Sequence, residues 1–278
     1  MKVRVLTAFG IALLGIPLLI FSEYLVFTIA LGALSFMATF EFLRAVGLHR
    51  RYVLTVPALF ISAILPELAH SSIVREENQM NYIVIVALVL FAYLLYLSAV
   101  LVFSGGRLRF SEAAMAFMGL TYITVSFTAL ALLRYMERGA YIFGLVFIGA
   151  WVSDTFAYFT GRLFGRHKLA PKLSPKKTVE GSVGGIIFTV LAFILYGVII
   201  ESAFTLQANY IVLGVSGLLL SVISQIGDLF ASLIKRECGI KDYSRLLPGH
   251  GGILDRFDSI LAVSTVLMVI STLFPPFS

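Results

Sequence analysis

The stretch Asn209–Glu237, NYIVLGVSGLLLSVISQIGDLFASLIKRE, decides the fold class of this protein. It opens with an almost continuous apolar run, and about 20 such residues in a helix cross the roughly 30 Å of a bilayer's hydrocarbon. At 100° per residue, its polar side chains fall within an arc of about 80°. The stretch therefore predicts a membrane-spanning helix with one polar stripe, made of Ser221, Ser224, Asp228, Ser232 and Lys235.

The rest of the chain has the same character. Of its 278 residues, 59% are hydrophobic and 13% charged, with a mean hydropathy of +0.98, against about 45–50% and 25% in soluble domains. The N-terminal block has no cleavage site after it, which favours a first span over a signal peptide. The sequence predicts an all-α polytopic integral membrane protein with nine helices, near 3–22, 24–43, 52–69, 81–103, 112–133, 140–162, 183–200, 209–234 and 256–274.

The distribution of basic residues predicts the orientation of these spans, because cytoplasmic loops carry the excess of Lys and Arg. With a cytoplasmic N-terminus, all but three of the 21 Lys and Arg residues lie on the cytoplasmic side, the exceptions being Arg75, Arg134 and Arg138. Nine spans then place the C-terminus on the opposite side. No nucleic-acid partner is expected.

The chain has no separate soluble region, so its chemistry is expected in or beside the membrane. We expect residues 1–139 to form scaffold helices, with a lipid-facing or oligomer surface, and residues 140–278 to form catalytic helices with two basic cytoplasmic loops. A single cysteine, Cys238, excludes an intramolecular disulfide and a multi-thiolate metal site. Surfaces of small residues would permit a homodimer without requiring one.

Acidic residues inside the later spans are the strongest indication of function. Asp228 lies about 10 Å before Lys235 along its helix, below the headgroups, where an ionised carboxylate costs a few kcal/mol without a partner or ion. Asp255 and Asp258 share one face at the start of the last span. Convergence of these three carboxylates at a cytoplasmic-side cavity would suit a hard cation such as Mg²⁺, in a number that the sequence does not give.

The loop after the sixth span provides complementary groups. Ser174-Pro175-Lys176-Lys177-Thr178 places hydroxyls and ammonium groups before Glu180, which suits an anionic polyphosphate. Asp154 and Arg162 lie on one face of the sixth helix, where Asp154 makes either an intramembrane polar contact or a structural pair. The glycine pairs Gly161/Gly165 and Gly181/Gly185 favour close helix packing over chemistry.

These residues form a pattern that resembles a known family, the phosphatidate cytidylyltransferases, also called CDP-diacylglycerol synthases. The resemblance covers roughly residues 150 to 260. It implies Mg²⁺-dependent conversion of CTP and phosphatidic acid to CDP-diacylglycerol and pyrophosphate, on the cytoplasmic face of the inner membrane. The matching positions are Asp154, Ala157-Tyr158, Gly161-Arg162, Gly165, Ser174-Pro175-Lys176-Lys177-Thr178 and Glu180-Gly181 upstream, then Ser232-x-x-Lys235-Arg236, Lys241-Asp242 and Pro248-x-His250-Gly251-Gly252-x-x-Asp255-Arg256-x-Asp258.

With this resemblance the candidate site residues receive roles. The metal ligands would be Asp228, Asp255 and Asp258, and these three act in catalysis with Lys235 and His250. The residues expected to bind the substrates CTP and phosphatidate are Ser174, Lys176, Lys177, Thr178, Glu180, Ser224, Ser232, Arg236, Lys241, Asp242, Arg256, Asp154 and Arg162. The surrounding membrane lipids are the remaining partners.

Two other classes of function stay open on the sequence. Intramembrane acids also mark ion pathways, so an ion-coupled transporter is the first alternative. The second is a CTP-dependent enzyme that acts on another lipid phosphate or on a lipid alcohol. A CDP-alcohol phosphotransferase is disfavoured because its D-G-x-x-A-R signature is missing.

Overall fold

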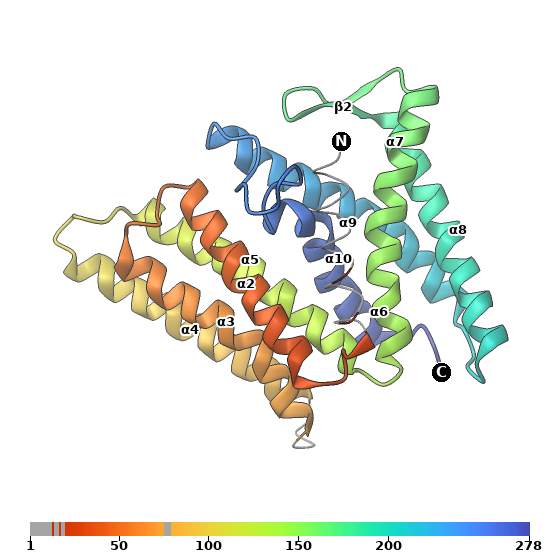
Figure 1. Ribbon diagram of the computed structural model, residues 1–278, viewed down its shortest axis with the longest axis horizontal. Helices are drawn as coiled ribbons and strands as arrows, with labels where there is room; N and C mark the ends of the chain where they lie inside the picture. The colour runs from red at the N-terminus through yellow and green to blue at the C-terminus, as the bar shows by residue number, and fades with distance from the viewer. Residues whose placement is uncertain (1–12, 14–16, 18–19, 75–78) are drawn as a thin grey trace. The chain divides into compact units, whose positions relative to one another are not determined.

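The computed structural model describes residues 13, 17, 20–74 and 79–278 (Figure 1). Within these ranges eight helices are long and apolar enough to cross a membrane. They correspond to the later eight predicted spans, whereas the predicted span 3–22 lies almost entirely outside the described residues. The prediction of an all-α polytopic membrane protein is confirmed. The helices are α2 (Leu25–Ala45), α3 (Tyr52–Val74), α4 (Gln79–Phe103), α5 (Phe110–Tyr135), α6 (Gly139–Phe147) with the π-helix η1 (Ile148–Val152) and α7 (Ser153–Phe164) in one span, α8 (Val179–Ala203), α9 (Tyr210–Glu237) and α10 (Leu254–Leu273).

The chain divides into two compact units. The first comprises Met1–Tyr135 and Ile240–Arg256, and the second Met136–Gly239 and Phe257–Ser278. The break near residue 135 lies close to the boundary expected from the sequence at 139. The loop that precedes α10, however, groups with the N-terminal helices and not with the rest of the C-terminal half.

In the first unit, α2 packs against α3 and α5, with α4 alongside α3 and α5 (Figure 1). Leu43, Leu54 and Phe127 are fully buried in its core. Two tyrosines fasten α4 to α3: Tyr82 donates its hydroxyl to the Leu65 carbonyl at 2.5 Å, and Tyr93 donates to the Leu54 carbonyl at 3.0 Å. These bonds satisfy hydroxyls that lipid could not, while most of the other side chains of α4 stay exposed to the bilayer.

In the second unit, α7 and α8 lie side by side (Figure 1). Their contact is built from small residues: a Cβ on Gly181 would lie 3.0 Å from the Cα of Gly161, and one on Gly185 would lie 2.9 Å from the carbonyl oxygen of Ser153. Backbones this close gain dispersion contacts that compensate for the missing hydrophobic effect between helices in lipid. The prediction that the glycine pairs serve helix packing is confirmed for Gly161, Gly181 and Gly185, whereas Gly165 lies after the end of α7 against the Thr178 side chain.

Helix α9 packs against α8, and its polar stripe is buried at Ser221, Ser224 and Lys235 and half-buried at Asp228 and Ser232. Ser221 and Ser224 are fully buried, and the hydroxyls of Ser153 and Ser221 lie 2.8 Å apart. Gln225 donates to the Ser182 carbonyl at 3.3 Å. Ser221 and Ser224 of the predicted stripe thus face protein instead of lipid, as intramembrane polar groups must.

The loop between α7 and α8 has structure of its own. Strands β1 (Lys168–Ala170) and β2 (Ser174–Thr178) pair in antiparallel register, with Lys168 opposite Thr178 and Ala170 opposite Ser174. The sequence had predicted only a loop at this position. The hairpin matters because it gives Lys176 and Lys177 fixed positions on β2.

Candidate active site

Three acidic side chains of the second unit lie within electrostatic range of one another: Asp154 of α7, Asp228 of α9 and Asp258 of α10. We call them the acidic cluster. Lys177 from β2 forms an ion pair with Asp228, and Lys235 of α9 interacts with Asp258. Two ammonium groups therefore offset part of the repulsion among three carboxylates.

Small side chains allow the acidic cluster to form. A Cβ on Gly227 would lie 2.8 Å from the Ala262 Cβ and 2.9 Å from the Asp258 carbonyl oxygen, so α9 and α10 approach closely beside Asp228. Ser259 donates hydrogen bonds to both Asp154 and Asp258. Its hydroxyl donates to Asp154 at 3.3 Å, and its backbone N–H donates to Asp258 at 2.8 Å. The π-helix η1 directly before α7 is a wider helical turn of a kind frequent at functional sites. It changes the direction in which the first side chains of α7, including Asp154, point from the helix axis.

The ion pair of Lys177 with Asp228 does not use all the hydrogen-bonding capacity of the lysine. The two side chains are 23% and 27% exposed, but the Lys177 nitrogen itself is buried, and within the described residues it has no hydrogen-bond partner beyond this ion pair. An ammonium has three N–H donors, so Lys177 can hold Asp228 and a phosphate oxygen together. The arrangement therefore offers a carboxylate that can bind a cation and an ammonium group that can bind an anion.

The residues present fit a hard divalent cation by their chemistry, since Asp228 and Asp258 offer only oxygen. Lys177 contacts Oδ2 of Asp228, which directs any metal ion to the other carboxylate oxygen. In the part of the chain that the structure describes, no three or more His, Cys, Asp or Glu side chains are already arranged to hold a metal. The third predicted ligand, Asp255, belongs to the first unit.

Asp255 organises the loop before α10. It is 8% exposed, and its Oδ2 accepts hydrogen bonds from the backbone N–H groups of Tyr243 at 2.8 Å and Gly252 at 2.9 Å. A Cβ on Gly251, whose φ is +85°, would lie 2.8 Å from the same oxygen. Oδ2 of Asp255 thus stabilises the loop, whatever Oδ1 binds.

The predicted catalytic His250 sits at the end of a tight turn. Its N–H donates to the Leu247 carbonyl at 2.8 Å, with Pro248 and Gly249 between them and a φ of +78° at Gly249. Proline followed by a left-handed glycine is typical of a type II turn. The imidazole Nδ1 is buried without a hydrogen-bond partner among the described residues, so it can still bind another group.

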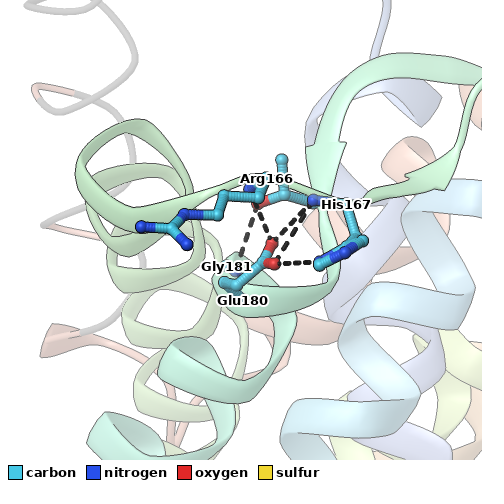
Figure 2. A network of polar contacts seen from close by, with 5 residues as sticks. Arg166, His167, Glu180 and Gly181 are labelled. Carbon is cyan, nitrogen blue, oxygen red and sulfur yellow. Dashed lines mark hydrogen bonds and ion pairs between the residues drawn. The ribbon is translucent and has the colours of Figure 1, made fainter.

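Two predicted substrate-binding residues have local structural partners. The Thr178 hydroxyl caps α8 by accepting from Gly181 N at 3.1 Å. Figure 2 shows the Glu180 carboxylate accepting from the backbone N–H groups of Arg166 at 3.0 Å and His167 at 3.2 Å, and lying 2.6 Å from Nδ1 of His167. The Arg166 guanidinium extends away from it (Figure 2). Glu180 therefore fastens the base of the hairpin.

The remaining predicted residues differ in exposure. Ser174 and Ser232 are half-buried, while Lys235 and Ser224 are buried. The Ser224 hydroxyl has no hydrogen-bond partner within the described ranges. The exposed residues are Arg162, Lys176, Arg236, Lys241, Asp242 and Arg256.

Sequence reasoning missed two residues with several polar contacts. One is His167, the partner of Glu180. The other is Glu41, a buried acid of α2 that accepts three hydrogen bonds from the loop before α10. The signal for Glu41 was present, because an acid at the end of an otherwise apolar span needs a partner as Asp228 does.

Fold and candidate site together define the class: an integral membrane protein that gathers carboxylates and ammonium groups from its C-terminal helices and the hairpin. The family model described as "Cytidylyltransferase family" matches residues 2–274. The chain belongs to this family, and it is an enzyme, a transferase.

Curated relatives agree with the family match. The phosphatidate cytidylyltransferase of Staphylococcus saprophyticus is 36% identical over 280 residues, covering 97% of this chain and 98% of its own. Those of Staphylococcus haemolyticus and Staphylococcus aureus are 33% and 34% identical, with the same coverage. The resemblance drawn from the sequence motifs is confirmed, and it extends through the N-terminal half.

Proposed function

We propose that this enzyme transfers the cytidylyl group of CTP to phosphatidic acid, giving CDP-diacylglycerol and pyrophosphate. Similarity along 97% of the chain to proteins named phosphatidate cytidylyltransferase supports the reaction. The observation that carries the proposal is the ion pair of Lys177 with Asp228 beside Asp154 and Asp258, since the reaction brings two polyanions together.

In this reaction an oxygen of the phosphatidate monoester attacks the α-phosphorus of CTP. A new P–O bond forms, the bond from the α-phosphorus to the bridging oxygen breaks, and pyrophosphate leaves with the electron pair. The lipid phosphate is itself the nucleophile, so no covalent enzyme intermediate is required. The main barriers are charge repulsion and in-line alignment, which fixed cationic groups and binding sites lower.

The side chains divide this work. Lys177 and Lys235 offset phosphate charge beside the acidic cluster, and Lys177 holds Asp228 in place. The exposed Lys176, Arg236 and Lys241 bind phosphate groups of the nucleotide or the lipid. His250, with its buried Nδ1, orients the departing pyrophosphate or braces its own turn.

Mg²⁺ is the proposed cofactor, with Asp228 and Asp258 as ligands and Asp255 as the third on sequence grounds. When bound, such an ion neutralises phosphate oxygens and the leaving group. Lys177 is then available to donate to a phosphate. Asp154 shares Ser259 with Asp258 and so helps to position that carboxylate.

We further propose that the site faces the cytoplasm. All but three of the 21 Lys and Arg residues fall on one side of the nine-span topology, which is the cytoplasmic side by the positive-inside rule. CTP is soluble, whereas phosphatidate keeps its acyl chains in the bilayer. A site on α9 and α10 at headgroup depth would serve both substrates.

The test is to incubate purified protein with phosphatidate and Mg²⁺ and each nucleoside triphosphate in turn, following pyrophosphate and lipid product together. We expect equal amounts of pyrophosphate and CDP-diacylglycerol with CTP. Asp228→Asn should abolish both, whereas Glu137→Gln, at an exposed site in a turn outside the helices, should not. Pyrophosphate without a CDP-lipid, or full activity of Asp228→Asn, would contradict the proposal.

A further inference from the structure

The loop before α10 is held by an acid from the opposite end of the sequence. Glu41 of α2 is 4% exposed, and both of its carboxylate oxygens accept hydrogen bonds. Oε1 receives the Ser244 hydroxyl at 2.6 Å and the Ile253 N–H at 3.0 Å, and Oε2 receives the Leu254 N–H at 2.9 Å. We call residues 240–256 the signature loop; like Glu41, it belongs to the first unit.

The physical reason for this contact lies at the start of α10. The first N–H groups of a helix have no intrahelical acceptor, and the helix dipole favours negative charge there. Glu41 provides that charge from another helix. A Cβ on Gly252 would lie 2.5 Å from Oε1 of Glu41, so the glycine is what lets the chain approach the carboxylate.

A second carboxylate holds the same loop from within. Asp255 accepts from Tyr243 N and Gly252 N. Glu41 holds the neighbouring positions Ser244 and Ile253. The two acids together fasten both arms of the loop, which carries His250 in its turn between them.

We infer that Glu41 is a positioning residue for the reaction: it fixes the signature loop so that residues such as His250 and Lys241 meet the nucleotide. This inference rests on the proposed function for its kinetic consequence. The fastening itself rests only on contacts within the first unit.

Glu41→Gln separates this role from side-chain volume. Because Oε1 and Oε2 both accept, an amide of the same shape must turn its NH₂ toward at least one donor and lose that hydrogen bond. Ser244→Ala removes one of the three donors to Glu41, together with the acceptor of the Leu246 N–H, and keeps the two backbone donors to Glu41. The matched control is Glu23→Gln, an exposed acid of the first unit that pairs with Arg134.

The direct measurement is limited trypsin digestion of the full chain in detergent micelles. Lys241 and Arg245 are exposed in the signature loop, and cleavage there follows how often the loop opens. We expect cleavage after these two residues to rise about tenfold in Glu41→Gln, as for a lost hydrogen bond to a charged group, and less in Ser244→Ala. Cleavage after Lys172, in the hairpin of the second unit, is the internal reference and should not change.

The kinetic measurement separates positioning from general damage. A variant that only loses folded enzyme keeps its KM, whereas a displaced loop should raise the KM for CTP and lower kcat/KM about tenfold or more. Ser244→Ala should move the same parameters less, and should add little in the Glu41→Gln background because both act on one loop.

The outcomes are separable. Wild-type cleavage in Glu41→Gln would disprove the fastening, and faster cleavage with an unchanged KM and kcat/KM would disprove the positioning role. If Glu41→Gln does not fold, Ser244→Ala decides both points. Wild-type protein that forms no CDP-lipid would overturn the proposed function, while the digestion would still decide the fastening.

Discussion

Replacing Gly181 with alanine is expected to destabilise the second unit, because α7 and α8 leave no room for a methyl group at this point. The added Cβ would lie 2.5 Å from the Ala157 carbonyl oxygen, 2.9 Å from the Thr178 hydroxyl and 3.0 Å from the Gly161 Cα. Two of these are backbone atoms, which cannot rotate away. The helices must therefore separate.

The size of the effect follows from three contributions. Overpacking of this kind costs about 1–3 kcal/mol. Displacing the Thr178 hydroxyl from Gly181 N weakens the helix cap by about 1 kcal/mol. Alanine regains at most about 1 kcal/mol of helix propensity. The net loss is about 1–3 kcal/mol, which lowers the ratio of folded to unfolded protein about 5- to 150-fold.

The assay is equilibrium unfolding by SDS in mixed micelles, followed by the fluorescence of Trp151. This residue is the only tryptophan of the sequence and lies in η1 of the same unit. The control is Gly214→Ala on α9, where the new Cβ meets only the Ile194 side chain at 3.8 Å and should stabilise the helix by up to about 1 kcal/mol. Equal stability of the two variants would refute the packing argument.

Three further predictions concern the polar residues. Lys177→Ala should lower the rate of CDP-lipid formation at least about tenfold under saturating CTP, because it removes a fixed positive charge beside the acidic cluster. Glu180→Gln should weaken the base of the hairpin, seen as faster trypsin cleavage after Lys172 with unchanged cleavage after Arg245. Burial and the neighbouring Glu237 raise the pKa of the Cys238 thiol. A membrane-impermeant maleimide should therefore label Cys238 slowly at neutral pH, and the labelling rate should rise about tenfold for each unit of pH increase until the pH reaches that pKa. Labelling should occur only in inside-out vesicles; labelling in right-side-out vesicles would contradict the cytoplasmic placement.

The sequence predicted many residues of the candidate site, but it did not predict which groups those residues contact. The sequence indicated both Lys177 and Asp228, yet their ion pair depends on the hairpin that carries Lys177 on β2. Thr178 and Glu180 were predicted to bind substrate. In the structure Thr178 accepts from the backbone at the start of α8, and Glu180 contacts the backbone of Arg166 and His167 and the His167 ring. Hydroxyls and carboxylates serve either purpose, so residue type alone cannot separate the two.

The sequence by itself determined the class of protein and its spans, because transfer of apolar side chains into lipid is local and nearly additive along a helix. The stripe on α9 also followed from helical periodicity alone. Tertiary structure decided the partners of the buried acids. Glu41 and Ser244 are 203 residues apart in the chain and bonded in the fold, and no local pattern encodes such a contact, since it depends on how α2 and the signature loop pack within the first unit.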